Sequence, residues 1–203
     1  MYELRDGYTR ILIEAGLPIK EMQKLSGYSL SGIDACYISH RHNDHCKGYL
    51  GLLKMGLDVV FAEDFKKGFC ITKNIEVKTF PVPHDVPNYG FMFRSLRDAE
   101  TMVFITDAFY CPVVFSFSPT IIMIECNYAH DLIGDCNYSD RLYQSHMSLK
   151  QCLETLRAND LSKCREIHLL HLSDDHSDEE RFVREVQELT GVPTFAAPKK
   201  IKI

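Results

Sequence analysis

The chain has 203 residues and a formal net charge of −5, from 23 lysine and arginine residues against 28 aspartate and glutamate residues. Hydrophobic residues make up 45% and charged residues 25%, which is the composition of a globular protein with a full core. This acidic balance argues against a protein that wraps a long polynucleotide, because such proteins need a basic surface. No apolar run is long enough to span a bilayer, and the eight cysteines include no CxxC pair. We therefore expect one cytoplasmic domain over residues 1–203, with reduced thiols and no membrane association.

Apolar runs predict strands along the whole chain, with helical patterns between some of them. In chain order, strands are expected at residues 9–14, 36–39, 58–62, 75–81, 89–94, 102–106, 120–125, 166–170 and 194–197. Helices are expected at residues 18–25, 49–55, 148–158 and 177–190. This order of elements favours an α/β fold in which helices cover sheets in layers.

The segment after the predicted strand at 36–39 is the richest in chemistry. Within six positions it carries His40, His42, Asp44 and His45, in the run HRHNDH. Imidazole and carboxylate groups together bind zinc, iron and similar ions. One histidine alone is usually structural, but four potential ligands in one strand-to-helix loop indicate a metal site.

Several later strands also end in residues that can bind a metal or carry a proton. These residues are His84, Asp107, Glu125 and His171, and His146 stands just before the helix expected at 148–158. Each of them alone could be a turn residue or a helix cap. Because loops gather polar groups on one rim of a sheet, we expect them to contribute to a common site.

Together, these residues resemble the metallo-β-lactamase fold. HRHNDH followed by Gly48 matches its HxHxDHxxG motif, and His84, Asp107 and His171 match its later ligands. The resemblance covers almost the whole chain and is closest to the phosphodiesterase branch. That branch includes tRNA-maturing endonucleases, small bacterial exonuclease-like proteins and phage anti-Pycsar proteins, which destroy cyclic-nucleotide signals. It implies an αββα sandwich; the usual first strand, before the segment at 8–16, is expected to be missing here.

The resemblance also implies a role for each matching residue. A first divalent ion would be held by His40, His42 and His84, a second by Asp44, His45 and His171, and Asp107 would bridge the two. Glu14, where the family usually has aspartate, would orient a ligating imidazole. Asp44 and His146 would be catalytic, with His146 protonating the leaving oxygen, and His130 is a candidate to reach the substrate. Zinc is the expected metal and manganese the alternative.

We therefore expect a metal-dependent phosphodiesterase that uses water activated by two ions. A cyclic nucleotide is the sharpest substrate candidate, because the chain is short and acidic and has no inserted basic arm. One alternative is a DNA or RNA nuclease, and another is a degenerate homologue that binds a ligand without turnover. A thioester or lactam hydrolase would share the metal chemistry, and only the surroundings of His146 speak against it. The resemblance also implies a homodimer, acting in the host cytoplasm if the protein is phage-encoded.

Overall fold

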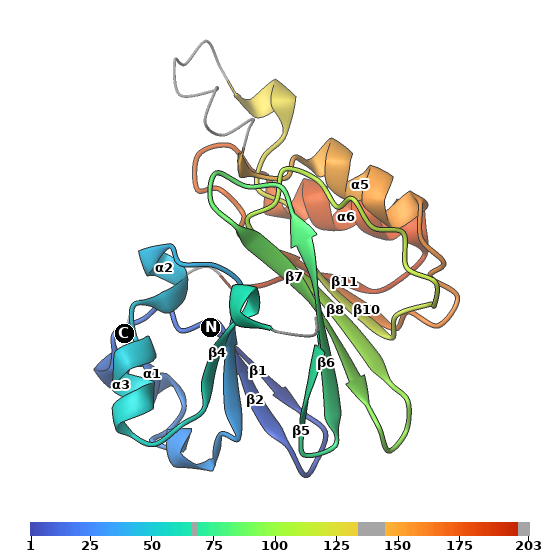
Figure 1. Ribbon diagram of the computed structural model, residues 1–203. Coiled ribbons are helices and arrows are strands. Elements are labelled where there is room, and N and C mark those ends of the chain that lie inside the picture. Colours follow the sequence, from blue (N-terminus) through green and yellow to red (C-terminus); the bar gives the residue numbers. More distant parts are fainter. Residues whose placement is uncertain (66–68, 134–144, 199–203) are drawn as a thin grey trace. The chain divides into compact units, whose positions relative to one another are not determined.

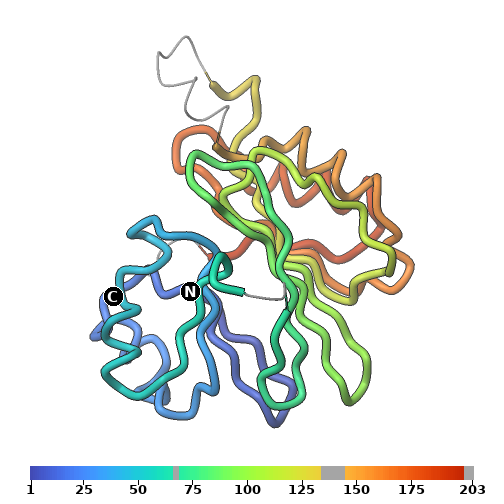
Figure 2. The backbone as a smooth tube through the Cα atoms, in the orientation of Figure 1, coloured from blue at the N-terminus to red at the C-terminus, as the bar shows by residue number. Residues whose placement is uncertain are grey.

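A computed structural model describes residues 1–65, 69–133 and 145–198 (Figure 1; Figure 2 follows the same backbone as a tube). The chain divides into two compact units, Met1–Thr79 with Phe93–Ala99, and Phe80–Met92 with Glu100–Ile203. Among the described residues, no helix combines the length and the apolar character that crossing a bilayer requires.

The first unit contains a four-stranded sheet in the order β1-β2-β3-β4. Strand β1 pairs antiparallel with β2, whereas β2, β3 and β4 are parallel. The elements of this part are β1 Tyr2–Arg5, β2 Arg10–Ile13, α1 Ile19–Leu25, the 3-10 turn Leu30–Gly32, β3 Ala35–Ile38, α2 Asn43–Cys46, α3 Tyr49–Lys54, β4 Val59–Phe61, the 3-10 turn Ala62–Asp64 and β5 Phe69–Thr72.

The core of this first unit forms around β3, whose four residues are all buried. A strand buried on both faces reads as a continuous apolar run, which is why the sequence predicts it well. The apolar pattern does not predict strand β1, and the expectation that the strand before the segment at 8–16 is missing is corrected. Residues 2–5 form a paired strand of their own before β2. Its side chains are alternately half-buried and exposed, so it lacks the apolar signal of β3.

The second sheet has seven strands in the order β11-β10-β9-β8-β7-β6-β5, and β6 and β7 have residues in both units. Strands β8, β9, β10 and β11 are parallel to one another. The remaining elements are β6 Ile75–Val82, β7 Asn88–Ser95, β8 Thr101–Ile105, β9 Ile121–Glu125, the 3-10 turn His130–Leu132, α5 Leu149–Arg157, β10 Glu166–Leu170, α6 Glu179–Thr190 and β11 Thr194–Ala196.

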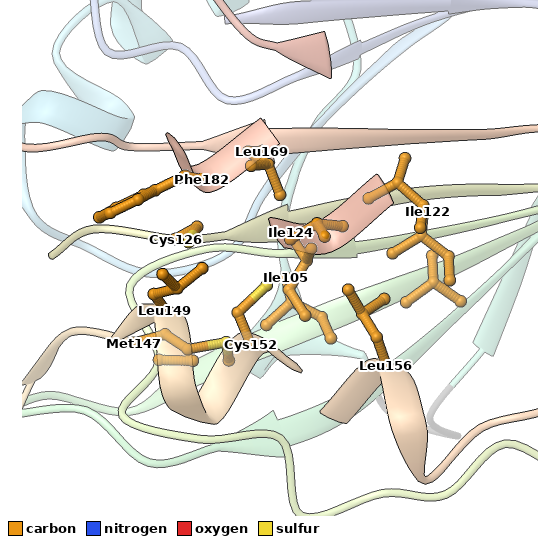
Figure 3. Packing of buried hydrophobic residues seen from close by; sticks show 14 of the residues in the cluster. Ile105, Ile122, Ile124, Cys126, Met147, Leu149, Cys152, Leu156, Leu169 and Phe182 are labelled. Atoms are coloured by element: carbon orange, nitrogen blue, oxygen red, sulfur yellow. The ribbon is translucent and has the colours of Figure 1, made fainter. Parts of the chain in front are cut away.

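Helices α5 and α6 supply the apolar cover of the second unit and lie side by side (Figure 1). Figure 3 shows Leu149, Cys152 and Leu156 of α5 packed among the isoleucines of β8 and β9. Helix α6 adds Phe182, which is fully buried. The start of α5 is fixed by a capping box in which Ser148 accepts from the backbone N–H three residues later.

Parallel pairing sets where the functional residues lie in each unit. In the second unit, Ile105 pairs with Ile124, and Leu170 pairs with Glu125. Strands β8, β9 and β10 therefore end at one edge of the sheet, where Asp107 and His171 follow directly. The same logic holds in the first unit, where β2 and β3 are in register and the segments after them both carry polar residues.

Candidate metal centre

In the first unit, the histidine segment (residues 39–46) brings three imidazoles together after β3. The ring centroid of His40 lies 4.7 Å from that of His42 and 4.2 Å from that of His45. His40 is buried, and its Nδ1 lies 2.9 Å from the hydroxyl of Ser39. A partner on Nδ1 fixes the ring orientation and leaves Nε2 as the ligating atom.

Glu14 is the buried carboxylate that supports this segment from the end of β2. Its Oε2 lies 3.2 Å from Nδ1 of His45, and its Oε1 accepts from the backbone N–H of Ser39 at 3.2 Å. Glu14 is expected to orient an imidazole, and the imidazole that it contacts is that of His45. Asp44 differs from its neighbours because its side chain is 70% exposed, with Oδ2 3.8 Å from Nε2 of His45.

Two glycines allow the histidine segment to lie directly against the backbone after β2. A Cβ on Gly16 would be 1.6 Å from the carbonyl oxygen of Asp44. A Cβ on Gly48 would be 2.4 Å from the carbonyl oxygen of Leu17 and 2.5 Å from Sδ of Met22. The last position of the HxHxDHxxG motif is therefore glycine for a steric reason.

In the second unit, four residues form what we call the strand-end cluster: Asp107, Glu125, His146 and His171. Each offers one ligand atom, and these atoms all lie within 4.8 Å of one another. Asp107 and Glu125 are buried, and Nδ1 of His171 lies 3.1 Å from a carboxylate oxygen of each. Two buried carboxylates whose oxygens lie within 4.8 Å of each other require positive charge nearby, as protons or as a metal ion.

His146 is held by Glu125, whose Oε1 accepts from its Nδ1 at 2.8 Å. Burial acts to lower the pKa of His146, but the hydrogen bond and charge of Glu125, helped by the charge of Asp107, outweigh it. The pKa of His146 is consequently raised above its ordinary value. The other carboxylate oxygen of Glu125 accepts from the backbone N–H of Ala108 at 2.7 Å. Glu125 thus orients two histidines and the turn after Asp107.

His84 follows β6 in the same unit and is nearly buried. Its Nδ1 donates to the carbonyl of Ser145 at 3.0 Å, and its Nε2 lies 3.0 Å from Oδ1 of Asp85 and 4.0 Å from Oδ2 of Asp107. The carbonyl on Nδ1 leaves Nε2 as the ligating atom, on the side of Asp107.

His130, the candidate for contact with substrate, belongs to the second unit. It opens the 3-10 turn His130–Leu132, its side chain is exposed, and its ring packs edge-on against Tyr128 at 5.3 Å. Its proposed contact with substrate stays a prediction.

In each unit, backbone strain occurs at residues of the candidate site. Glu14, Asp107 and His171 have φ values of 65°, 49° and 56°, in the left-handed region that residues with a side chain seldom adopt. Such strain persists where the surroundings hold it, commonly at functional sites. The buried imidazole and carboxylate donors fit a divalent cation.

Comparison with known proteins gives the fold. A family model described as "Anti-Pycsar protein Apyc1" matches residues 4–78, which include Glu14 and the histidine segment. The metallo-β-lactamase fold protein YhfI from Bacillus subtilis is similar with a TM-score of 0.75, at 16% identity, over 98% of this chain and 89% of that one. The protein has the metallo-β-lactamase fold. The expected fold class is therefore confirmed.

Two further solved structures share this fold. The short form of human tRNase Z matches with a TM-score of 0.66, at 14% identity, over 98% of this chain and 89% of that one. Yeast PDE1 matches with a TM-score of 0.56, at 15% identity, over 83% of this chain and 68% of that one. No curated protein sequence matches the chain.

From the sequence alone, Glu125 is predicted only to be a strand-end carboxylate. Its hydrogen-bond partner His146 lies 21 residues further along the chain, so no local motif could reveal this contact. The sequence signal that indicates Glu125 is its position at the end of β9, because the neighbouring strands β8 and β10 are also followed by polar residues.

Proposed function

We propose that the protein is a metal-dependent hydrolase that cleaves phosphodiesters, with a cyclic mononucleotide as substrate. The observation that carries this proposal is the strand-end cluster of the second unit. It combines two buried carboxylates, which call for cations, with a histidine whose pKa is raised by Glu125. A metal-ligand set beside a histidine whose Nδ1 is held by Glu125 suits hydrolysis in which an alkoxide must be protonated as it leaves.

The ligand assignment that we propose follows the resemblance to the fold. His40, His42 and His84 would hold one ion, Asp44, His45 and His171 would hold the other, and Asp107 would serve as a ligand to both. When bound, the ions supply Lewis acidity and lower the pKa of a water molecule. Zinc is the metal that we propose, because histidines outnumber carboxylates in this set.

His146 is proposed as the general acid. Its Nδ1 is held by Glu125, so the proton for the leaving oxygen comes from Nε2. The phosphorus–oxygen ester bond breaks and the leaving oxygen takes that proton. The attacking water supplies the new oxygen on phosphorus and releases one proton to solvent, and neutral His146 regains a proton from solvent. Glu125 keeps the remaining Nδ1–H in place, so the ring stays oriented when it becomes neutral.

Three facts support a small phosphodiester. The net charge of −5 disfavours a long polynucleotide track. The family model that matches residues 4–78 is named for an anti-Pycsar protein, and yeast PDE1 shares the fold. A nuclease acting on DNA or RNA is the second candidate, because human tRNase Z matches 98% of this chain.

The test is hydrolysis by purified protein, stripped of metal and reloaded with Zn²⁺ or Mn²⁺. The panel contains 3′,5′-cyclic mononucleotides, single-stranded DNA, RNA and a thioester. We expect His146→Ala to lower kcat by about 10²- to 10⁴-fold on cyclic mononucleotides, while metal content stays unchanged. The matched control is His168→Ala, since His168 also pairs with a glutamate, Glu166 at 3.0 Å, but on the surface of β10.

Each other outcome assigns a different function. Cleavage of polynucleotides alone would replace the cyclic nucleotide with a nuclease substrate. Loss of metal from the His146→Ala variant would make this residue a ligand and not an acid. A wild-type protein that binds metal but cleaves nothing in the panel would favour a degenerate binding protein.

Two parts of the proposal concern assembly. We propose a homodimer, by resemblance to the fold's phosphodiesterase branch, and a single functional domain over residues 1–203 in the cytoplasm. Light scattering of the metal-loaded protein gives the mass of the assembly, and elemental analysis of the same sample gives the number of ions per chain.

A further inference from the structure

Two buried asparagines in the second unit contact the backbone of residues in the strand-end cluster. The side-chain Nδ2 of Asn88 donates to the carbonyl of Asp107 at 2.6 Å and to that of Thr106 at 2.9 Å. The side-chain Nδ2 of Asn127 donates to the carbonyl of His171 at 2.6 Å. Asn88 is 2% exposed and Asn127 is 6% exposed.

Two of the three carbonyls that accept from these amides belong to the two left-handed residues of this unit's cluster. Asp107 has φ 49° and His171 has φ 56°, and each stands just after a parallel strand. A residue with a side chain leaves this conformation readily unless neighbouring groups hold it there. In both cases a buried amide N–H, on a segment distant in sequence, supplies that hold.

We propose that Asn88 and Asn127 are positioning residues for metal binding. Their amides fix the backbone of Asp107 and His171, and thereby aim those side chains at the ion. This inference rests on the metal-binding part of the proposed function. Neither asparagine belongs to the motif or to the ligands suggested by the resemblance.

Asn127 joins three segments around the cluster. Its backbone N–H donates to the carbonyl of Met147 at 2.8 Å, next to His146, and its own carbonyl accepts from the N–H of Ser173 at 2.9 Å. Its side-chain Oδ1 is buried and has no hydrogen-bond partner in the described part of the chain. A buried amide oxygen without a hydrogen-bond donor destabilises the fold. The hydrogen bond from Nδ2 to the carbonyl of His171 is therefore the contact that favours asparagine at this position.

Both the Nδ2 and the Oδ1 of Asn88 form hydrogen bonds, which holds its side chain in one orientation. Its Oδ1 accepts from the backbone N–H of Tyr89 at 2.8 Å, while Nδ2 spans the two carbonyls of Thr106 and Asp107. A hydroxyl has one hydrogen to donate and could not hold both carbonyls at once. The position therefore requires an amide rather than any small polar side chain.

The experiment uses the variants Asn88→Leu and Asn127→Leu, which keep the branching and the number of heavy atoms of the side chain and remove its hydrogen-bonding groups. The matched control is Asn159→Leu, because Asn159 also donates from Nδ2 to a carbonyl, that of Thr155 at 2.8 Å, at the end of α5. Each protein is stripped of metal and titrated with Zn²⁺ against a chromophoric chelator. The melting temperature of the metal-free form is measured in parallel.

We expect Zn²⁺ affinity to fall by about 10- to 100-fold in Asn88→Leu and Asn127→Leu, the usual range for groups that orient metal ligands, and to stay within about twofold in Asn159→Leu. Asn127→Ser, whose hydroxyl can reach the carbonyl of His171 through a water, should recover part of the loss. This variant also serves if the leucine variant does not fold.

Two results would contradict the inference, and they are distinguishable. Equal melting-temperature losses in all three leucine variants with unchanged Zn²⁺ affinity would reduce the asparagines to a structural role, and the proposed function would stand. A wild-type protein that binds no Zn²⁺ would overturn the proposed function and the positioning role together.

Discussion

Glu125 offers the sharpest test of the strand-end cluster. It is fully buried, and its two oxygens accept from His146, His171 and the backbone N–H of Ala108. The substitution Glu125→Gln keeps the shape but replaces one acceptor oxygen with an NH₂ donor. If that NH₂ faces Ala108, it opposes the backbone N–H there, which is also a donor. If it faces His146 and His171, the hydrogen bonds from both imidazoles are lost. No orientation of glutamine satisfies all three donors.

The expected loss of unfolding free energy follows from the number of hydrogen bonds that glutamine cannot accept. A hydrogen bond to a charged group contributes about 1.5–3 kcal/mol, and a buried donor left without an acceptor costs about 1–3 kcal/mol. We therefore expect the metal-free variant to lose about 3 kcal/mol of unfolding free energy. For a chain of this size that corresponds to a melting temperature lower by about 6–12 °C. The assay is thermal unfolding followed by circular dichroism in the presence of a chelator.

The pH dependence gives the same prediction a second readout. The pKa of His146 is raised in the folded protein, so its pairing with Glu125 stabilises fully below the unfolded value of 6.5. That contribution is lost as pH rises through the folded pKa. The gap in melting temperature between wild type and Glu125→Gln should therefore be wider at pH 6 than at pH 9. In the loaded enzyme, the basic limb of the activity profile should move to lower pH.

The control is Glu166→Gln, in which the glutamate also accepts from a histidine, His168 at 3.0 Å, but with 49% of its side chain exposed. An exposed pair contributes about 0–1 kcal/mol, so this variant should melt close to wild type. A Glu125→Gln protein that melts within about 1 °C of the control would refute the reasoning from buried acceptors.

The remaining predictions concern the first unit. Gly16→Ala should displace the histidine segment, because its Cβ would lie 1.6 Å from the carbonyl oxygen of Asp44. We expect the free energy of unfolding to fall by about 1–3 kcal/mol, measured by thermal melting, and Zn²⁺ to bind more weakly, measured by titration. The Arg5 guanidinium, helped by Arg10, holds the pKa of Glu3 at about 2, below its ordinary value of 4.5. The stabilising effect of Glu3 is thus present above pH 4.5 and lost towards pH 2, so acid titration should erase the difference between wild type and Glu3→Gln.

Gly27→Ala is the control for the steric argument at Gly16. Gly27 has a left-handed φ of 58°, but a Cβ there would meet no atom within 4 Å. The variant should lose about 1–2 kcal/mol from backbone strain alone and keep its Zn²⁺ affinity. Equal Zn²⁺ affinities in the two alanine variants would argue against a displaced histidine segment.

The sequence predicts the buried part of the fold better than its edges. Strands such as β3 and β8 appear as apolar runs because parallel strands in a sheet are buried on both faces. Strands β1 and β5 were missed, since each is four residues long and alternates between exposed and half-buried side chains. Their place depends on pairing with a neighbour, which no local pattern records.

The candidate site divides in the same way. The histidine segment is visible because its ligands lie within one short run, and the strand-end residues Asp107 and His171 follow apolar strands. Asn88 and Asn127 left no signal, because an amide becomes meaningful only when folding brings it to a left-handed carbonyl. Glu125 was visible as a strand-end acid, but its partners lie 21 and 46 residues away.

The buried carboxylates of Asp107 and Glu125 also have a consequence for the life of the protein in a cell. Nδ1 of His171 lies 3.1 Å from an oxygen of each carboxylate, so negative charge stays concentrated in the cluster when no cation is bound. An ion that binds only the folded form at a hundred times its Kd adds about 2.7 kcal/mol. We expect metal supply to set how much of the protein survives proteolysis, so that starvation for the ion lowers abundance as well as activity.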